Sequence, residues 1–105
     1  MDSSELLNNL RSRLEPVFGR RLRNVVLYGS AARGEDAPDS DIDILVVLEE
    51  PVHFAADLST ITRALYSLQL DMADRPLHAI PVPASDYKAG TFALYRNAQR
   101  EGIAG

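Results

Sequence analysis

Gly29–Leu48, with the sequence GSAARGEDAPDSDIDILVVL, decides the fold class of this chain. The segment opens on a glycine–serine turn, passes through a polar loop and enters a continuous apolar run by way of Asp41 and Asp43. Such a turn exposes backbone N–H groups and a hydroxyl, and carboxylate oxygens are ligands that hard cations prefer. The segment therefore predicts a strand whose entrance lies beside a turn suited to phosphate and a divalent metal ion.

Upstream of this segment, the sequence predicts one helix and one strand. We expect a helix over about 4–15, capped at its start by Asp2 and ended by Pro16. The short apolar run Asn24–Tyr28 then predicts a buried strand that stops at Gly29. The glycine–serine turn thus directly follows a strand.

Downstream, the apolar run 42–48 is continuous rather than alternating. This pattern is typical of a central strand that is covered on both faces. A long helix over 53–70 is expected next, because its apolar residues recur at helical spacing. These residues are Phe54, Leu58, Ile61, Leu65 and Leu68.

The last third of the chain predicts one more strand and one more helix. The strand over 77–82 is expected at an edge of the sheet, because Pro81 has no N–H to donate. Ser85 is the expected N-cap of a last helix that carries Phe92, Leu94 and Tyr95. The predicted fold is α/β (α+β), a small mixed β-sheet with helices packed on it, in a single domain over 1–105.

Composition narrows the function classes. The formal net charge of −4 argues against a direct nucleic-acid binder, which usually presents a basic surface. Arginines do crowd the N-terminal segment, as a solvated helix face or as a patch for an acidic partner; they are Arg11, Arg13, Arg20, Arg21 and Arg23. The chain has no cysteine, signal-peptide pattern or membrane-length apolar run, so we expect a soluble cytoplasmic protein.

Asp41 and Asp43 are spaced two residues apart at the strand entrance. Strand side chains alternate, so both carboxylates are expected on one face, with Cα atoms about 6.5–7 Å apart. Carboxylates this close repel each other unless a cation lies between them. The alternative is an acidic loop in which Asp43 merely begins a strand, but the nearby glycine–serine turn favours a metal site.

The turn supplies candidate phosphate ligands. Gly29 permits close approach by phosphate, and Ser30 offers a hydroxyl and a backbone N–H at the start of a short helical turn. Arg33 is placed one helical turn later, where two roles stay open. It either binds phosphate or pairs with Asp41 or Asp43.

The combination of Gly29-Ser30-x-x-Arg33-Gly34 with Ser40-Asp41-x-Asp43 resembles the signature of nucleotidyltransferases related to DNA polymerase β. The small size and the residues of these two motifs look most like those of the minimal nucleotidyltransferases, or MNT proteins. Many of these proteins act as antitoxins of HEPN-domain toxins. The resemblance implies that Gly29 and Ser30 hold the triphosphate, and that catalytic Asp41 and Asp43 hold Mg²⁺ or Mn²⁺. It also implies transfer of a nucleoside monophosphate, commonly AMP from ATP, to a hydroxyl group with loss of pyrophosphate.

The sequence departs from the family pattern at a third carboxylate, which the family carries on a neighbouring strand. Here that strand is expected over 77–82, where no Asp or Glu occurs and His78 is the polar candidate. His78 is either a base or metal ligand or a half-exposed residue of an edge strand.

Two hypotheses for function follow. One is an active nucleotidyltransferase that modifies a HEPN-type toxin partner. The other is an MNT-like antitoxin that neutralises its partner by contact with little or no catalysis, which the missing carboxylate favours. The sequence leaves the acceptor, the preferred nucleotide and the oligomeric state open.

Overall fold

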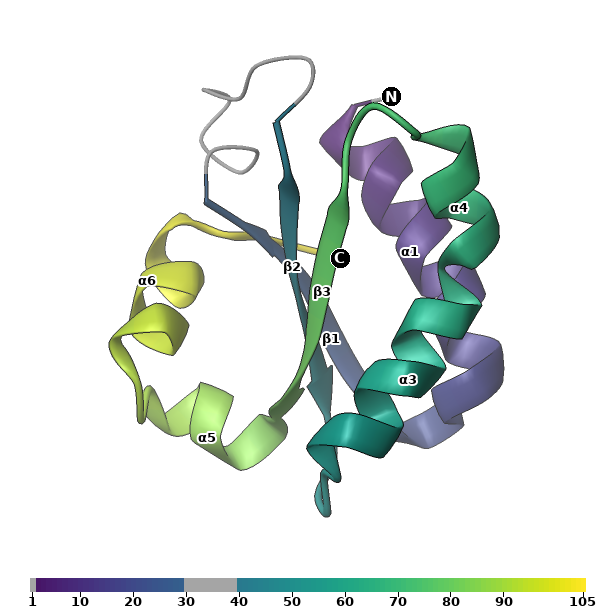
Figure 1. The fold of residues 1–105 in the computed structure, drawn as a ribbon. Coiled ribbons are helices and arrows are strands. Elements are labelled where there is room, and N and C mark those ends of the chain that lie inside the picture. Colours follow the sequence, from purple (N-terminus) through teal and green to yellow (C-terminus); the bar gives the residue numbers. More distant parts are fainter. Residues whose placement is uncertain (1, 30–39) are drawn as a thin grey trace.

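A mixed sheet forms the centre of the molecule in the computed structural model, which describes residues 2–29 and 40–105 (Figure 1). Within these residues the sheet has four strands in the order β3-β2-β1-β4. β1 is antiparallel to both β2 and β4, whereas β2 and β3 are parallel. The strands are β1 (Leu22–Tyr28), β2 (Ile42–Leu48), β3 (Leu77–Pro83) and β4 (Ile103–Ala104). The predicted mixed sheet with packed helices is confirmed.

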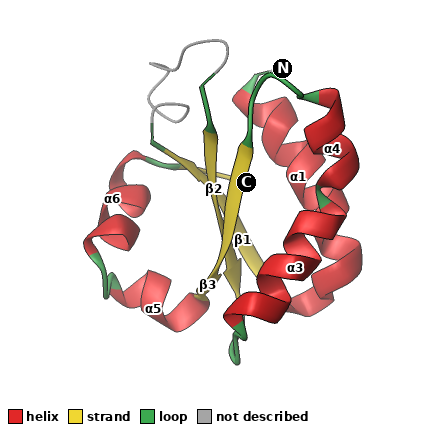
Figure 2. Cartoon of the chain, viewed as in Figure 1, coloured by secondary structure: helices red, strands yellow, loops and turns green. Residues whose placement is uncertain are grey.

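Helices cover both faces of the sheet (Figure 2). One face packs against α1 (Ser3–Phe18), α3 (Phe54–Ala64) and α4 (Tyr66–Asp71), and the other against α5 (Ala84–Ala89) and α6 (Ala93–Glu101). A 3-10 turn, η1 (Gly19–Arg21), joins α1 to β1. None of the helices in the described part of the chain is both long enough and apolar enough to cross a membrane.

β2 lies between β1 and β3, and its bounds agree with the apolar run in the sequence. Its side chains alternate between the two faces: Ile44 joins the core beneath α1 and α3, and Leu45 joins the core beneath α5 and α6. Both are fully buried, and each such side chain contributes about 1.5–3 kcal/mol through the apolar area removed from water. The continuous apolar run is thus explained by cover on both faces.

α1 begins as expected but does not end at Pro16. The Asp2 side chain accepts a hydrogen bond of 2.8 Å from the Glu5 N–H, which confirms the predicted N-cap. The helix continues through Pro16 to Phe18, whose side chain is buried, and Gly19 ends it with a positive φ of 56°. The free energy gained by burying Phe18 therefore outweighs the cost of the backbone hydrogen bond that Pro16 cannot donate.

The long helix expected over 53–70 is divided at Leu65 into α3 and α4. Backbone hydrogen bonds still cross the junction, from Leu65 to Ile61 and from Gln69 to Leu65, so the division is a bend rather than a gap. The predicted apolar face is correct for Ile61, Leu65 and Leu68, which are buried. It is wrong for Phe54, which is 56% exposed.

The predicted last helix is also two helices, because Gly90 adopts a left-handed conformation and ends α5. Ser85 lies inside α5 and is not an N-cap; its N–H donates instead to the Glu50 carboxylate at 2.8 Å. This hydrogen bond lowers the pKa of Glu50. The prediction missed β4, which follows Gly102 at a point where a Cβ would lie 2.7 Å from Val26 Cγ1.

Candidate nucleotide and metal site

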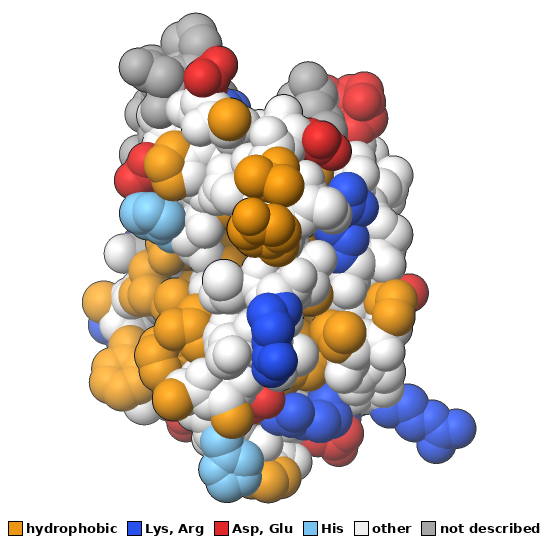
Figure 3. Space-filling model, turned by 45° about the vertical axis from the view of Figure 1, so that its right-hand side comes forward, with side chains coloured by type: hydrophobic (Ala, Val, Ile, Leu, Met, Phe, Trp, Pro, Cys, Tyr) orange, Lys and Arg blue, Asp and Glu red, His pale blue; other side chains and the backbone are white. Residues whose placement is uncertain are grey.

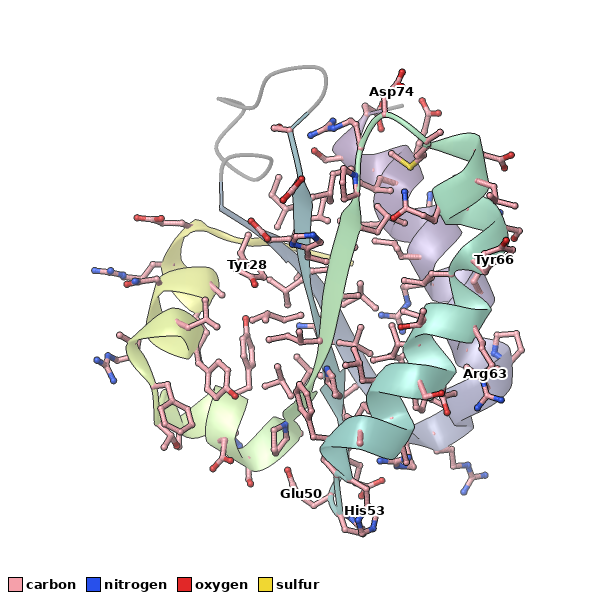
Figure 4. All side chains as sticks on the ribbon, in the orientation of Figure 1. Tyr28, Glu50, His53, Arg63, Tyr66 and Asp74 are labelled. Atoms are coloured by element: carbon pink, nitrogen blue, oxygen red, sulfur yellow. The ribbon has the colours of Figure 1, made fainter. Side chains whose placement is uncertain are left out.

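Tyr28, Asp43 and His78 form a row across three neighbouring strands. Tyr28 of β1 is opposite Asp43 of β2, and Asp43 is opposite His78 of β3. Residues in register share a face of a sheet, and this row lies on the face that packs against α5 and α6. In Figure 4 the Tyr28 side chain lies on the side of the sheet that faces α6. Burial and the nearby Asp43 charge both raise the pKa of Tyr28.

Asp41 precedes β2 and approaches the same row. Its Oδ2 atom lies 3.6 Å from Nε2 of His78, and both side chains are about half exposed. The contact draws the Asp41 side chain to the side of the sheet that carries Asp43. The two carboxylates of the sequence motif are therefore placed at the same end of the sheet, as their spacing predicts.

Gly29 lies directly against the Asp43 carboxylate. A Cβ atom on Gly29 would be only 2.8 Å from Oδ2 of Asp43, and the glycine has a φ of 75°. An L side chain is disfavoured at this φ, and the atom it would add meets the carboxylate. Glycine at this position is thus explained by two local requirements, the conformation of the turn and the room that Asp43 occupies.

Two of the predicted site residues, Ser30 and Arg33, lie outside the described residues, as does Gly34. Their predicted roles at a phosphate group stay predictions. The same holds for the choice between phosphate and carboxylate as the partner of Arg33.

Arg75 is a residue that the sequence analysis missed. Its Nε donates to the Ser40 carbonyl at 2.9 Å, and its guanidinium lies 3.3 Å from the Ser40 hydroxyl. Next to it, the Pro76 carbonyl accepts from the Ile42 N–H at 2.9 Å. These bonds fix the backbone on both sides of Asp41. A lone arginine in a turn carries no sequence pattern that predicts this contact.

The carboxylate pair suits magnesium bound together with a nucleotide. Mg²⁺ in proteins is commonly held by one or two carboxylates, with substrate phosphates and water completing its shell. Asp41 and Asp43 supply that number, and Gly29 leaves the Asp43 carboxylate unobstructed by a Cβ. Within the described ranges, no three His, Cys, Asp or Glu side chains are grouped to hold an ion by themselves. The two carboxylates therefore fit a magnesium ion whose remaining ligands are phosphate oxygens and water.

β3 is the neighbouring strand on which the family carries its third carboxylate. The strand spans Leu77–Pro83 at the sheet edge and carries neither Asp nor Glu. His78 occupies the register position beside Asp43, and its side chain is 57% exposed. It is a half-exposed residue of an edge strand beside Asp41 and Asp43, and its role as a base or metal ligand stays a prediction.

A cavity of about 170 Å³ adjoins Gly29 on the α6 side. It is lined by Tyr28 and Gly29 from the end of β1 and by Leu94, Asn97, Ala98 and Glu101 from α6. A smaller cavity of about 100 Å³ lies on the opposite face of the sheet, among α3, α4 and β3. Only the first of these adjoins the glycine beside the carboxylates.

Comparison with known proteins identifies the family of this chain. A model of the family described as "Nucleotidyltransferase domain" matches residues 4–89, which include both the turn and the carboxylates. A structure described as a putative nucleotidyltransferase from Sulfolobus solfataricus is similar with a TM-score of 0.62. The match covers 96% of this chain and 79% of that one at 19% identity, and it shows the fold alone.

Two curated proteins of Methanocaldococcus jannaschii are similar in sequence. "Putative protein adenylyltransferase MJ0604" is 38% identical over 56 residues, which are 53% of this chain and 52% of that protein. "Putative protein adenylyltransferase MJ0141" is 28% identical over 78 residues, covering 73% of this chain and 79% of that protein. The chain thus matches about half the length of the first relative. Because the family model spans most of the sequence, the chain belongs to the nucleotidyltransferase domain family.

Proposed function

We propose that this protein transfers AMP from ATP to a hydroxyl group on a protein partner, and that the partner is a HEPN-type toxin. The observation that carries the proposal is the Asp43 carboxylate placed against Gly29, with Asp41 at the same end of the sheet. The two relatives named as putative protein adenylyltransferases support AMP as the group and protein as the acceptor.

In this mechanism the chain chiefly positions its substrate. Gly29 and Ser30 would hold the triphosphate, and Asp41 and Asp43 would hold Mg²⁺ or Mn²⁺. A metal ion held by these carboxylates would supply positive charge to offset the negative charge that develops on the phosphoryl group and on the leaving group. The acceptor oxygen bonds to the α-phosphorus, the α–β bridging bond breaks, and pyrophosphate leaves with the electron pair. The hydroxyl proton passes to solvent, since β3 carries no carboxylate to accept it.

The exposed aromatic end of α6 is a candidate contact for the partner. Phe92 is 57% exposed and packs edge-on against Tyr95, with ring centroids 5.3 Å apart. The arginines of the N-terminal segment are the second candidate, although Arg21 is already paired with Asp57. A partner that brings its own surface to α6 would lie on the face of the sheet that carries Asp43.

A second candidate function is neutralisation of the partner by contact alone. The lack of a carboxylate on β3, with His78 beside Asp43, favours this alternative, because loss of a general base slows such reactions about 10²–10⁴-fold. The two functions differ in whether the acidic pair is needed.

The test is transfer of label from ATP carrying a radioactive α-phosphate to a co-expressed HEPN-type protein. We expect labelling by the wild type with Mg²⁺ or Mn²⁺, and loss of labelling in the D41N/D43N double variant. The same pair of proteins is then scored for toxin neutralisation in co-expression. If the double variant does not label the toxin but still neutralises it fully, neutralisation is by contact alone. Absence of both labelling and neutralisation in the wild type would overturn both functions.

A further inference from the structure

The cavity between the end of β1 and α6 begins at Gly29, the residue that also touches the Asp43 carboxylate. Four α6 residues line it at positions 94, 97, 98 and 101. This i, i+3, i+4, i+7 spacing places them on one side of the helix. The cavity therefore adjoins Gly29, the described residue of the candidate phosphate site, and is bounded by one face of α6.

Its lining is chemically mixed in a way that suits a flat heteroaromatic ring. The half-buried Tyr28 and the side chain of Leu94 provide apolar surface, and Leu94 is 37% exposed although it is a large aliphatic residue. Ala98 is small and buried, so α6 lies close to β1 below the cavity. An apolar side chain exposed within a cavity gains free energy when a ligand covers it.

Polar groups also line the same cavity. The Asn97 oxygen accepts from Arg100 at 2.6 Å, which directs its amide nitrogen to other acceptors. The Glu101 carboxylate adds acceptor oxygens, each with more than one lone pair. An amide donor next to a carboxylate acceptor matches the ring nitrogen and exocyclic amino group of adenine. A carboxylate here also disfavours a phosphate group in the cavity, which points to the base rather than the triphosphate.

We propose that this cavity holds the adenine base of ATP, with Tyr28 and Leu94 against the ring and Asn97 at its polar edge. The inference rests on the proposed function, because it presumes a triphosphate at the Gly29 turn. It adds residues that contact the nucleoside and that the glycine–aspartate motif does not contain. It also assigns α6, which the family match over 4–89 does not reach, a part in choosing the nucleotide.

The experiment compares the affinity of the intact chain for MgATP and for magnesium tripolyphosphate, which has the same phosphates and no nucleoside. Base stacking and edge contacts are expected to make MgATP bind about tenfold more tightly. Leu94→Ala and Asn97→Ala should reduce this ratio toward one and leave the tripolyphosphate affinity unchanged. Leu70→Ala, which truncates another exposed leucine, on α4 and away from the cavity, is the control and should keep the wild-type ratio.

Thermal melting of each variant checks that it is folded. A wild type that prefers MgATP while both cavity variants keep that preference would overturn the cavity assignment and leave the proposed function intact. Equal affinity of the wild type for the two ligands would also overturn the assignment. Failure of the wild type to bind either ligand would instead refute the proposed function.

Discussion

At the scale of single residues, the contact between Gly29 and the Asp43 carboxylate constrains which side chain each position can carry. The sequence predicts both as site residues, Gly29 for its conformational freedom and Asp43 for its spacing from Asp41. The structure adds that the Asp43 carboxylate fills the volume beside Gly29 where a Cβ would lie. That contact joins residues far apart in sequence, and no local pattern encodes it. His78 was identified from its residue type, but its register opposite Asp43 comes only from the strand pairing.

We predict that Gly29→Ala destabilises the protein and weakens MgATP binding together. The positive φ alone disfavours alanine by about 1–2 kcal/mol, and the new methyl group also displaces the Asp43 carboxylate. Chemical denaturation and MgATP titration measure the two effects.

Gly19→Ala provides the matched control for this variant. Gly19 also has a positive φ, of 56°, but a Cβ there would meet nothing within 4 Å. The backbone penalty should therefore recur in Gly19→Ala, while MgATP binding stays at the wild-type level. If the two variants bind MgATP equally well, the contact between Gly29 and Asp43 has no part in the site.

At the scale of elements, the strands were more predictable than the helices. β2 has sharp apolar ends, and its predicted and observed bounds agree. The helix boundaries depend on information that is not local: Phe18 extends α1 because the core receives its side chain, and Gly90 ends α5 by adopting αL. β4 has only two residues, and its pairing with β1 depends on where α6 returns the chain. Such contacts cannot be read from periodicity.

An ion pair joins η1, α3 and the loop between β2 and α3 at the other end of the sheet. The Arg21 guanidinium donates two hydrogen bonds to Asp57 of α3, at 3.2 and 3.0 Å, and one to the Pro51 carbonyl at 2.9 Å. The His53 N–H donates to the same carboxylate at 3.1 Å. Asp57 is only 7% exposed, and the hydrogen bonds from Arg21, together with the one from His53, lower its pKa.

This ion pair predicts a pH dependence of stability. A lowered pKa in the folded state means that the Asp57 carboxylate stabilises the fold above its unfolded pKa of about 4. That contribution is lost as the pH falls below 4 through the folded pKa. Asp57→Asn should lower the free energy of unfolding at pH 7 by about 1–3 kcal/mol and flatten its pH dependence below pH 4.

Denaturation at a series of pH values measures this effect, with Glu49→Gln as the control. Glu49 lies 3.6 Å from Arg23, and both side chains are more than half exposed, so this pair should contribute little. If Asp57→Asn keeps the wild-type stability and pH profile, the ion pair does not contribute to the stability of the fold.

At the scale of the whole molecule, the sheet separates a stabilising end from the candidate site. Glu50 and His53 lie at one end and Tyr28 at the other in Figure 4. β1 spans Leu22–Tyr28 between them, a length of about 20 Å for a strand of this size. Hydrophobic side chains reach the surface on the face drawn in Figure 3. The large exposed hydrophobic residues in the described part of the chain include Phe54, Tyr66 and Leu70.

This separation predicts that the two ends act independently. Sites this far apart with no shared partner have nearly additive effects. Asp57→Asn should lower the melting temperature and leave the affinity for MgATP within about twofold of the wild type, measured at a temperature where both proteins are folded. A large loss of MgATP affinity in this variant would show that the ends are coupled.

The central claim is that Asp41 and Asp43 beside Gly29 form a site for a metal–triphosphate. Isothermal titration of MgATP into the wild type and into Asp43→Asn tests it most directly, because asparagine keeps the size of the side chain and removes its charge. We predict that the wild type binds MgATP in a magnesium-dependent manner and that Asp43→Asn binds it at least about tenfold more weakly, with its melting temperature little changed. Equal, magnesium-independent affinity in the two proteins would contradict the claim.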